Sequence, residues 1–200
     1  MAPLNLELGI AGSAAPGQRV SGDLEVVHYY DRGGGVLVAA IDGVGHGEEA
    51  AASARLAADT ILRHPQENLA GLLMRCHVTL RGTRGVVLSI ARIDLRQATL
   101  SWLGVGNVVG VVFHANGHAA AREELLVRPG VLGYGDLPAL HASAIPLRPR
   151  DTLIFATDGI NRHFSEGLAF GASAQPLADH IMAHHCQRND DALVVVARAS

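Results

Sequence analysis

The chain has 200 residues, of which 48% are hydrophobic and 18% are charged, and its formal net charge is −3. This length and composition fit one globular domain spanning residues 1–200 and exclude an intrinsically disordered chain. Because the sequence carries no block of basic residues, no signal peptide and no long charge-poor apolar segment, we expect a cytoplasmic protein that binds neither nucleic acid nor membrane.

The first part of the chain predicts strands followed by two helices. Runs of apolar and β-branched residues favour strands, whereas a stretch rich in Ala, Leu and Arg favours a helix. Pro65 ends the first helix and fits the first turn of the second. We expect strands at 4–10, 24–30 and 35–41, and helices at 48–63 and about 66–80.

The second part predicts many strands and one helix. Residues 104–110 have the character of a hairpin turn, and 129–135 form a loop because three glycines and a proline leave little room for regular structure. We expect strands at 85–93, 98–105, 108–114, 123–128, 139–146, 152–157 and 192–198, and a helix at 175–186. Helices that are segregated from runs of strands indicate an α+β fold.

Five aspartates lie next to predicted strands. Asp23 precedes a strand, Asp42 and Asp158 each follow an apolar strand, and Asp190 and Asp191 precede the last one. Each alone fits a turn or a solvated surface. If strand ends bring them together, however, the carboxylates would repel one another and would require cations. Oxygen ligands favour hard ions such as Mg²⁺ or Mn²⁺.

A glycine follows two of these aspartates. Gly43 comes after Asp42, and Gly159 comes after Asp158. A glycine leaves the space beside a metal free of a side chain, so a main-chain carbonyl or an entering phosphate could approach closely. We therefore include both glycines in the predicted site.

Together these motifs resemble the PPM-type metal-dependent protein phosphatases, in their SpoIIE-like branch. The resemblance rests on S-G-D at 21–23, D-G-V-G-H-G at 42–47, T-D-G at 157–159, and D-D at 190–191 before an apolar terminal strand. Within that branch the chain is most similar to the RsbX-type stressosome feedback phosphatases. The similar segments are CHVTLRGTRGVVLSI, VGNV, TDGI and the NDDALVVVARAS end.

The resemblance implies two packed antiparallel β-sheets flanked by helices in α-β-β-α layers, with two divalent cations, Mn²⁺ or Mg²⁺, in a cleft at one end. Asp42 would bridge both ions, and Asp158 and Asp190 would bind the second ion. Asp23 would hold a metal-bound water from just outside. The full set of implied metal-site residues is Asp23, Asp42, Gly43, Asp158, Asp190 and Asp191, in which either member of the adjacent 190/191 pair can be the ligand.

The substrate side of the site is less determined by the sequence. Many relatives carry a histidine directly after the bridging Asp-Gly, a candidate general acid, but this chain has Val44 there and His46 two residues later. His46 fits a catalytic role or a structural turn. Arg19 is near the place expected for a phosphate-binding arginine, although an exposed turn residue fits it as well. Asn107 and Gly159 are further candidates for the cleft.

The resemblance implies two-metal hydrolysis of phosphoserine and phosphothreonine, with phosphorylated STAS-domain proteins of a bacterial stress-signalling complex as substrates in a negative feedback. The alternative is a phosphatase-fold regulator that binds a phosphorylated partner with little or no catalysis, which Val44 and the lack of a firm phosphate-binding arginine favour. A non-catalytic scaffold is a third reading, but it would not need acidic residues at several strand ends.

Overall fold

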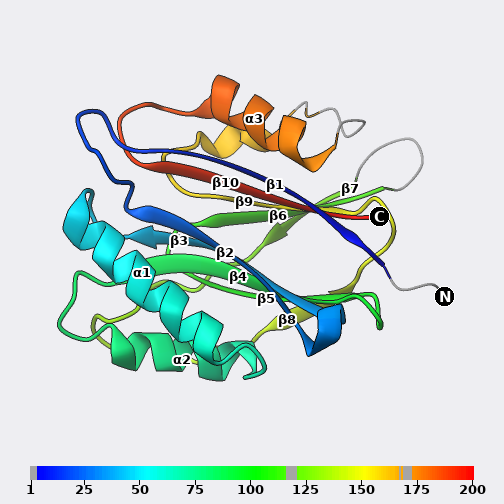
Figure 1. Ribbon diagram of the computed structural model, residues 1–200, viewed down its shortest axis with the longest axis horizontal. Helices are drawn as coiled ribbons and strands as arrows, with labels where there is room; N and C mark the ends of the chain where they lie inside the picture. The colour runs from blue at the N-terminus through cyan, green and yellow to red at the C-terminus, as the bar shows by residue number, and fades with distance from the viewer. Residues whose placement is uncertain (1–3, 116–120, 167, 169–172) are drawn as a thin grey trace.

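The fold is a two-sheet sandwich between layers of helices. In the computed structural model, which describes residues 4–115, 121–166, 168 and 173–200, two five-stranded antiparallel sheets lie face to face. Helix α3 covers one sheet, and α1 and α2 cover the other (Figure 1). The α+β class and the α-β-β-α layering expected from the sequence are thereby confirmed.

One sheet has the order β2-β3-β4-β5-β8. It consists of β2 (Asp23–Tyr30), β3 (Gly35–Gly43), β4 (Val86–Asp94), β5 (Thr99–Val105) and β8 (Ser143–Pro146). Its outer face is covered by α1 (Glu48–Arg63) and α2 (Leu69–Thr79), which bury their apolar residues against β3 and β4. Strand β3 is buried along almost its whole length, as a central strand with a covered face on either side requires.

The other sheet has the order β1-β10-β9-β6-β7. It consists of β1 (Leu6–Ser13), β10 (Ala192–Ala199), β9 (Thr152–Ala156), β6 (Val109–His114) and β7 (Ala121–Leu125), and α3 (Ala174–His185) lies on its outer face. The first and last strands of the chain pair with each other, from Leu6 opposite Ala199 to Ser13 opposite Ala192.

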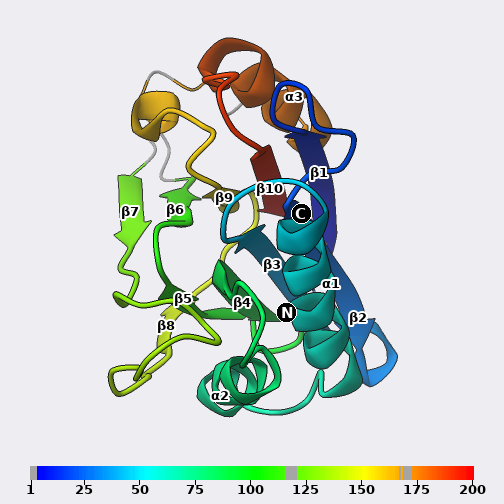
Figure 2. The ribbon, with the colours of Figure 1, turned by 90° about the vertical axis from the view of Figure 1, so that its left-hand side faces the viewer.

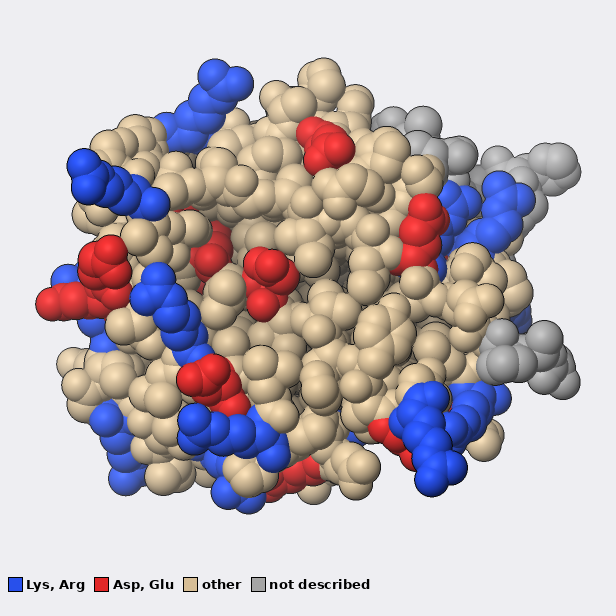
Figure 3. Space-filling view, in the orientation of Figure 1, with Lys and Arg blue, Asp and Glu red and all other residues tan. Residues whose placement is uncertain are grey.

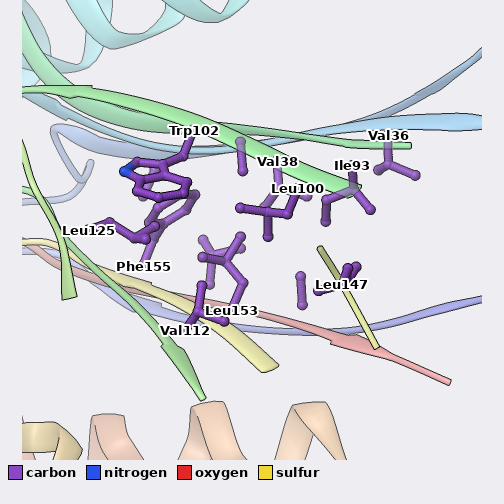
Figure 4. Packing of buried hydrophobic residues seen from close by; sticks show 14 of the residues in the cluster. Val36, Val38, Ile93, Leu100, Trp102, Val112, Leu125, Leu147, Leu153 and Phe155 are labelled. Atoms are coloured by element: carbon purple, nitrogen blue, oxygen red, sulfur yellow. The ribbon is translucent and has the colours of Figure 1, made fainter. Parts of the chain in front are cut away.

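The main core fills the space between the sheets. Trp102 from one sheet and Phe155 from the other lie close together there, among Val, Leu and Ile side chains (Figure 4). Burial of this apolar surface is the dominant stabilising contribution and fixes the two sheets against each other. Loops at the end of the sandwich can therefore be held in defined positions.

Three predicted strands have shifted or shortened bounds. The strand expected at 4–10 runs to Ser13 because its pairing with β10 continues to that residue. The strand expected at 139–146 is reduced to Ser143–Pro146, since β5 offers it partners only from Thr99 to Trp102. The one expected at 123–128 lies at Ala121–Leu125. Within the described ranges, no helix combines the length and apolar character needed to cross a membrane.

Candidate active site

The predicted acidic residues gather at one end of the sandwich. Asp23 begins β2 and lies directly opposite Asp42, the second-last residue of β3, in the antiparallel register. This end is at the left of Figure 1 and faces the viewer in Figure 2, where the loops that leave β3 and β9 and the one that enters β10 meet. Strands from both sheets thus deliver carboxylates to one place.

A pocket of about 230 Å³ opens at this end. Three carboxylates contribute to its wall, and none of the described residues that line it is basic. The lining residues are Asp42, Val44, Gly45, Val87, Gly106, Asn107, Asp158 and Asp190. The predicted catalytic residues Asp42, Asp158 and Asp190 therefore share one cavity, together with the predicted cleft residue Asn107.

Asp158 is held by neighbours on both sides of its loop. The Asn107 amide Nδ2 donates a hydrogen bond of 2.7 Å to Asp158 Oδ2, and Gln187 Nε2 donates one of 2.9 Å to the Asp158 main-chain carbonyl. The other amide atom of Asn107, Oδ1, is buried and has no hydrogen-bond partner within the described part of the chain. This oxygen is an acceptor beside three carboxylates, and a cation or a water bound to it would satisfy it.

Asp23 stands behind the pocket wall and has one strong partner. The Thr157 hydroxyl donates a 2.7 Å hydrogen bond to Asp23 Oδ2. Burial nevertheless raises the pKa of Asp23 to about 7, and the negative charges of Asp191, Asp158 and Asp190 add to the increase while the bond from Thr157 opposes it. Thr157 belongs to the T-D-G motif, yet its contact with Asp23 could not be read from the sequence.

Asp42 has the most perturbed carboxyl group of the site. Burial raises its pKa to about 8, and repulsion from Asp23, Asp158, Asp190 and Asp191 contributes in the same direction. A half-buried carboxylate surrounded by four others resists ionisation unless positive charge is nearby. The electrostatics therefore call for cations at this position.

The two adjacent aspartates differ in their surroundings. Asp191 is 3% exposed, and its Oδ1 and Oδ2 accept hydrogen bonds from the main-chain N–H groups of Ala15 (2.7 Å) and Gly22 (2.8 Å). Asp190 is half-buried and lines the pocket, and its Oδ1 accepts a hydrogen bond from Asp191 N–H. The geometry thus favours Asp190 as the ligand and gives Asp191 the role of fixing the segment that leads into Asp23.

The donor set fits hard divalent cations. Carboxylate and amide oxygens surround the pocket, and such oxygens are the ligands that Mg²⁺ and Mn²⁺ prefer. In the part of the chain that the structure describes, no three His, Cys, Asp or Glu side chains are already drawn together as a metal-binding group. One oxygen each of Asp23 and Asp158 is turned toward Thr157 and Asn107 instead, so ion binding would compete with these bonds.

Packing around the site requires both glycines. A Cβ on Gly43 would lie 2.2 Å from the Ala50 carbonyl oxygen in α1, and a Cβ on Gly159 would lie 2.0 Å from the Asp191 carbonyl oxygen. The missing side chains therefore let α1 and the start of β10 approach the acidic residues, and the close approach of a phosphate at either glycine stays a prediction. A metal contact from the Gly43 carbonyl stays a prediction.

Three of the predicted substrate-side residues, Arg19, His46 and Gly159, do not line the pocket. Arg19 is exposed in the segment between β1 and β2, and His46 is exposed in the loop between β3 and α1. Arg84, which sequence reasoning did not single out, lies against a residue of the pocket wall: a Cβ on Gly45 would be 2.8 Å from its Nη1. Its sequence signals were its place in the turn before β4 and within the CHVTLRGTRGVVLSI segment, which carries part of the family resemblance.

Three comparisons describe what the chain is similar to. The family described as Stage II sporulation protein E (SpoIIE) matches residues 32–200. Phosphoserine phosphatase RsbX of Bacillus subtilis (strain 168) is 23% identical over 168 residues, which cover 82% of this chain and 81% of that protein.

Solved structures share the fold over nearly the whole chain. A chain from a study of the bacterial stressosome as a modular system adapted to control secondary messenger signalling is 31% identical, with a TM-score of 0.86 and coverage of 97% and 100% of the two chains. RsbX in complex with magnesium is 20% identical, with a TM-score of 0.85 and full coverage of both chains, which supports the same fold.

Proposed function

The chain belongs to the SpoIIE family of metal-dependent phosphatases, and on that premise we propose that it hydrolyses phosphoserine or phosphothreonine in a protein substrate with two divalent cations, Mn²⁺ or Mg²⁺. The proposal assigns Asp42, Asp158 and Asp190 as the metal-binding carboxylates. It treats residues 1–200 as one catalytic domain.

One observation carries the proposal. Asp42, Asp158 and Asp190 come from distant parts of the chain and line a single pocket, in which burial and mutual repulsion raise the pKa of Asp42 to about 8. Such an arrangement is unfavourable without positive charge. A bound pair of cations would offset this repulsion and allow the carboxyl groups to ionise.

The residues of the chain have separate tasks. Asp42, Asp158 and Asp190 would hold the ions, Asn107 would keep Asp158 oriented, and Thr157 would position Asp23 behind them. The cations, when bound, lower the pKa of water and neutralise phosphoryl oxygens. The end of β3 holds Asp42, and the loop after β9, which Asn107 and Gln187 fix by hydrogen bonds, holds Asp158.

The direct test is phosphate release from a phosphoserine protein and from an aryl phosphate, measured with Mn²⁺, with Mg²⁺ and with a chelator. We expect turnover with either ion and none with the chelator. If the protein binds the phosphoprotein in the presence of Mn²⁺ but releases no phosphate, the binding-only alternative holds instead. The exposed Val44 at the pocket, in place of a histidine, is the observation that keeps that alternative in view.

The finer proposal concerns the substrate. We propose phosphorylated STAS-domain proteins of a stressosome-type complex, dephosphorylated as negative feedback in the cytoplasm. The named relative RsbX and the stressosome structure support this choice. Incubation with phosphorylated STAS proteins and with an unrelated phosphoserine protein would test it, and equal rates on both would contradict it.

A further inference from the structure

The pocket as described gathers negative charge that bound cations would offset. Asp42, Asp158 and Asp190 line it and Asp23 lies behind it, so four carboxylates face two divalent ions. A phosphomonoester that enters brings further negative charge. A positively charged side chain at the rim of the pocket would help to bind the phosphate group. Arginine suits this task best, because its planar guanidinium forms paired hydrogen bonds with phosphate oxygens.

The backbone of Arg84 is fixed at that rim. It lies in the turn between α2 and β4, where the Thr83 hydroxyl donates to the Leu80 carbonyl (2.7 Å) and accepts from Gly85 N–H (3.0 Å). Gly85 has a φ of +79°, and a Cβ there would lie 2.6 Å from the Leu132 carbonyl oxygen, so a glycine is required. The Gly85 carbonyl in turn accepts a 3.1 Å hydrogen bond from the N–H of Val44, which lines the pocket.

The side chain of Arg84 lies over the loop that forms the pocket wall. Its Nη1 is 2.8 Å from the position that a Cβ on Gly45 would take, and its Nη2 forms a 2.5 Å ion pair with Glu49 Oε2. Arginine and carboxylate side chains lie next to each other at this end of the molecule (Figure 3). The Glu49 carboxylate, in the first turn of α1, therefore holds the Arg84 guanidinium beside the pocket.

Little free energy is needed to break the ion pair between Arg84 and Glu49. The Arg84 and Glu49 side chains are 46% and 72% exposed, and exposed ion pairs of this kind contribute little to stability because water and salt screen them. A phosphate dianion with two paired hydrogen bonds is a stronger partner for the guanidinium than a single solvated carboxylate.

We infer that Arg84 is a substrate-binding residue that exchanges Glu49 for the phosphoryl group of the phosphorylated side chain. The inference rests on the proposed function and names the residue that would grip the phosphate. Glu49 then acts as a placeholder that holds the guanidinium at the rim while no substrate is bound. This role would fall to Arg84 and not to Arg19, because the Val44–Gly85 hydrogen bond joins the turn of Arg84 to the pocket wall and the guanidinium lies against Gly45, which lines the pocket.

The test compares the two partners of the ion pair. Hydrogen bonds to charged groups contribute about 1.5–3 kcal/mol, so Arg84→Ala should raise KM for a phosphoserine protein, and the inhibition constant of inorganic phosphate, by about 10- to 100-fold. The value of kcat should change much less. Arg84→Lys, which keeps the charge but loses the paired geometry, should fall between Ala and wild type.

Glu49→Gln distinguishes a substrate-binding role of Arg84 from a purely structural role, in which the ion pair only holds α1 and the turn together. If Arg84 binds phosphate, this variant frees the guanidinium, and KM should fall or stay the same. If the ion pair only holds the turn in place, both variants should raise KM in parallel. Arg81→Ala, at an exposed arginine just after α2, is the matched control and should leave KM unchanged.

Binding measurements keep this inference distinct from the proposed function. Wild-type turnover with unchanged KM in Arg84→Ala would overturn the role of Arg84 while the phosphatase assignment stands. A wild-type protein that binds phosphoprotein in Mn²⁺ without turnover, and loses that binding in Arg84→Ala, would overturn the assignment and keep the role of Arg84. If the wild type is inactive and Arg84→Ala binds phosphoprotein as tightly as the wild type does, both the phosphatase assignment and the role of Arg84 are wrong.

Discussion

Strand β9 has an aspartate at each end, and the two ends differ in what surrounds the carboxylate. Asp151 precedes the strand and is 1% exposed. Its oxygens accept hydrogen bonds from the main-chain N–H groups of Ala115 (2.9 Å) and Arg148 (3.0 Å), and Oδ2 lies 3.0 Å from His114 Nδ1. Burial of a charge is tolerated there because donors surround it.

Asp158, at the other end of β9, opens into the pocket with Asp42 and Asp190. Here carboxylates meet carboxylates, and burial raises the pKa of Asp42 to about 8. The comparison teaches that burial of an acidic residue is not itself a functional signal. What separates a structural acid from a metal-binding one is whether the protein supplies enough donors, and Asp191, although near the pocket, belongs with Asp151 by this criterion.

The largest expected effect is that of Asp42→Asn. The change removes a carboxylate that the proposed function assigns to the cations. Because metal ions contribute several kcal/mol to stabilisation of the transition state, turnover should fall by at least about 100-fold. Without metal, the variant should melt at the same or a higher temperature than wild type, because repulsion among the carboxylates is relieved. Phosphate release and thermal unfolding in a chelator measure the two effects.

Asp151→Asn is the matched control at the other end of the sandwich. The NH₂ group of the new amide would face one of the N–H groups that donate to the Asp151 carboxylate in the wild type, so two donors would oppose each other. This should destabilise the fold by about 2 kcal/mol and lower the melting temperature by roughly 4–8 °C. Turnover measured well below the melting temperature should stay near wild type. If instead Asp42→Asn destabilises the protein and Asp151→Asn abolishes turnover, the comparison of the two ends is wrong.

The adjacent pair offers a sharper form of the same comparison. Asp190→Asn should reduce turnover by roughly tenfold or more while the melting temperature of the metal-free protein stays the same, since loss of a metal ligand weakens ion binding. Asp191→Asn should lower the melting temperature by several degrees, because it turns an amide toward Ala15 or Gly22 N–H. Loss of turnover in Asp191→Asn without any change in melting temperature would make Asp191 the ligand.

The sequence could predict the shared pocket because its acidic residues follow or precede clearly apolar strands within a recognisable set of motifs. It could not decide between Asp190 and Asp191, since neighbouring residues point in different directions and only the paired strands show which one is buried. The contacts of Gly43 with α1 and of Arg84 with Glu49 join segments whose packing no local pattern reveals. Asp151 precedes a strand in the sequence, much as Asp23 does. Only the N–H groups that donate hydrogen bonds to Asp151 in the folded protein distinguish it from the acidic residues of the pocket.

The smallest expected effect is a pH dependence at the Asp151 end. Burial lowers the pKa of His114, but hydrogen bonds and charges from Asp151 and Glu123 outweigh burial, and the net pKa lies above 6.5. The folded protein therefore keeps a proton that the unfolded chain has lost between pH 6.5 and that raised value. The stability that this proton confers is fully present below about pH 6.5 and is lost as the pH rises through the raised pKa.

His114→Gln should remove this dependence. The difference in unfolding free energy between wild type and the variant should be about 1 kcal/mol at acidic pH and should shrink toward alkaline pH, as measured by urea unfolding from pH 5.5 to 9. His141→Gln, at an exposed histidine, serves as the control and should show no such trend. Turnover should not follow it either, because His114 lies at the opposite end of β6 from Asn107 and the pocket. If the difference in unfolding free energy grows with pH instead, Asp151 interacts with a neutral His114. The main-chain N–H groups would then be the donors that distinguish the surroundings of Asp151 from the pocket.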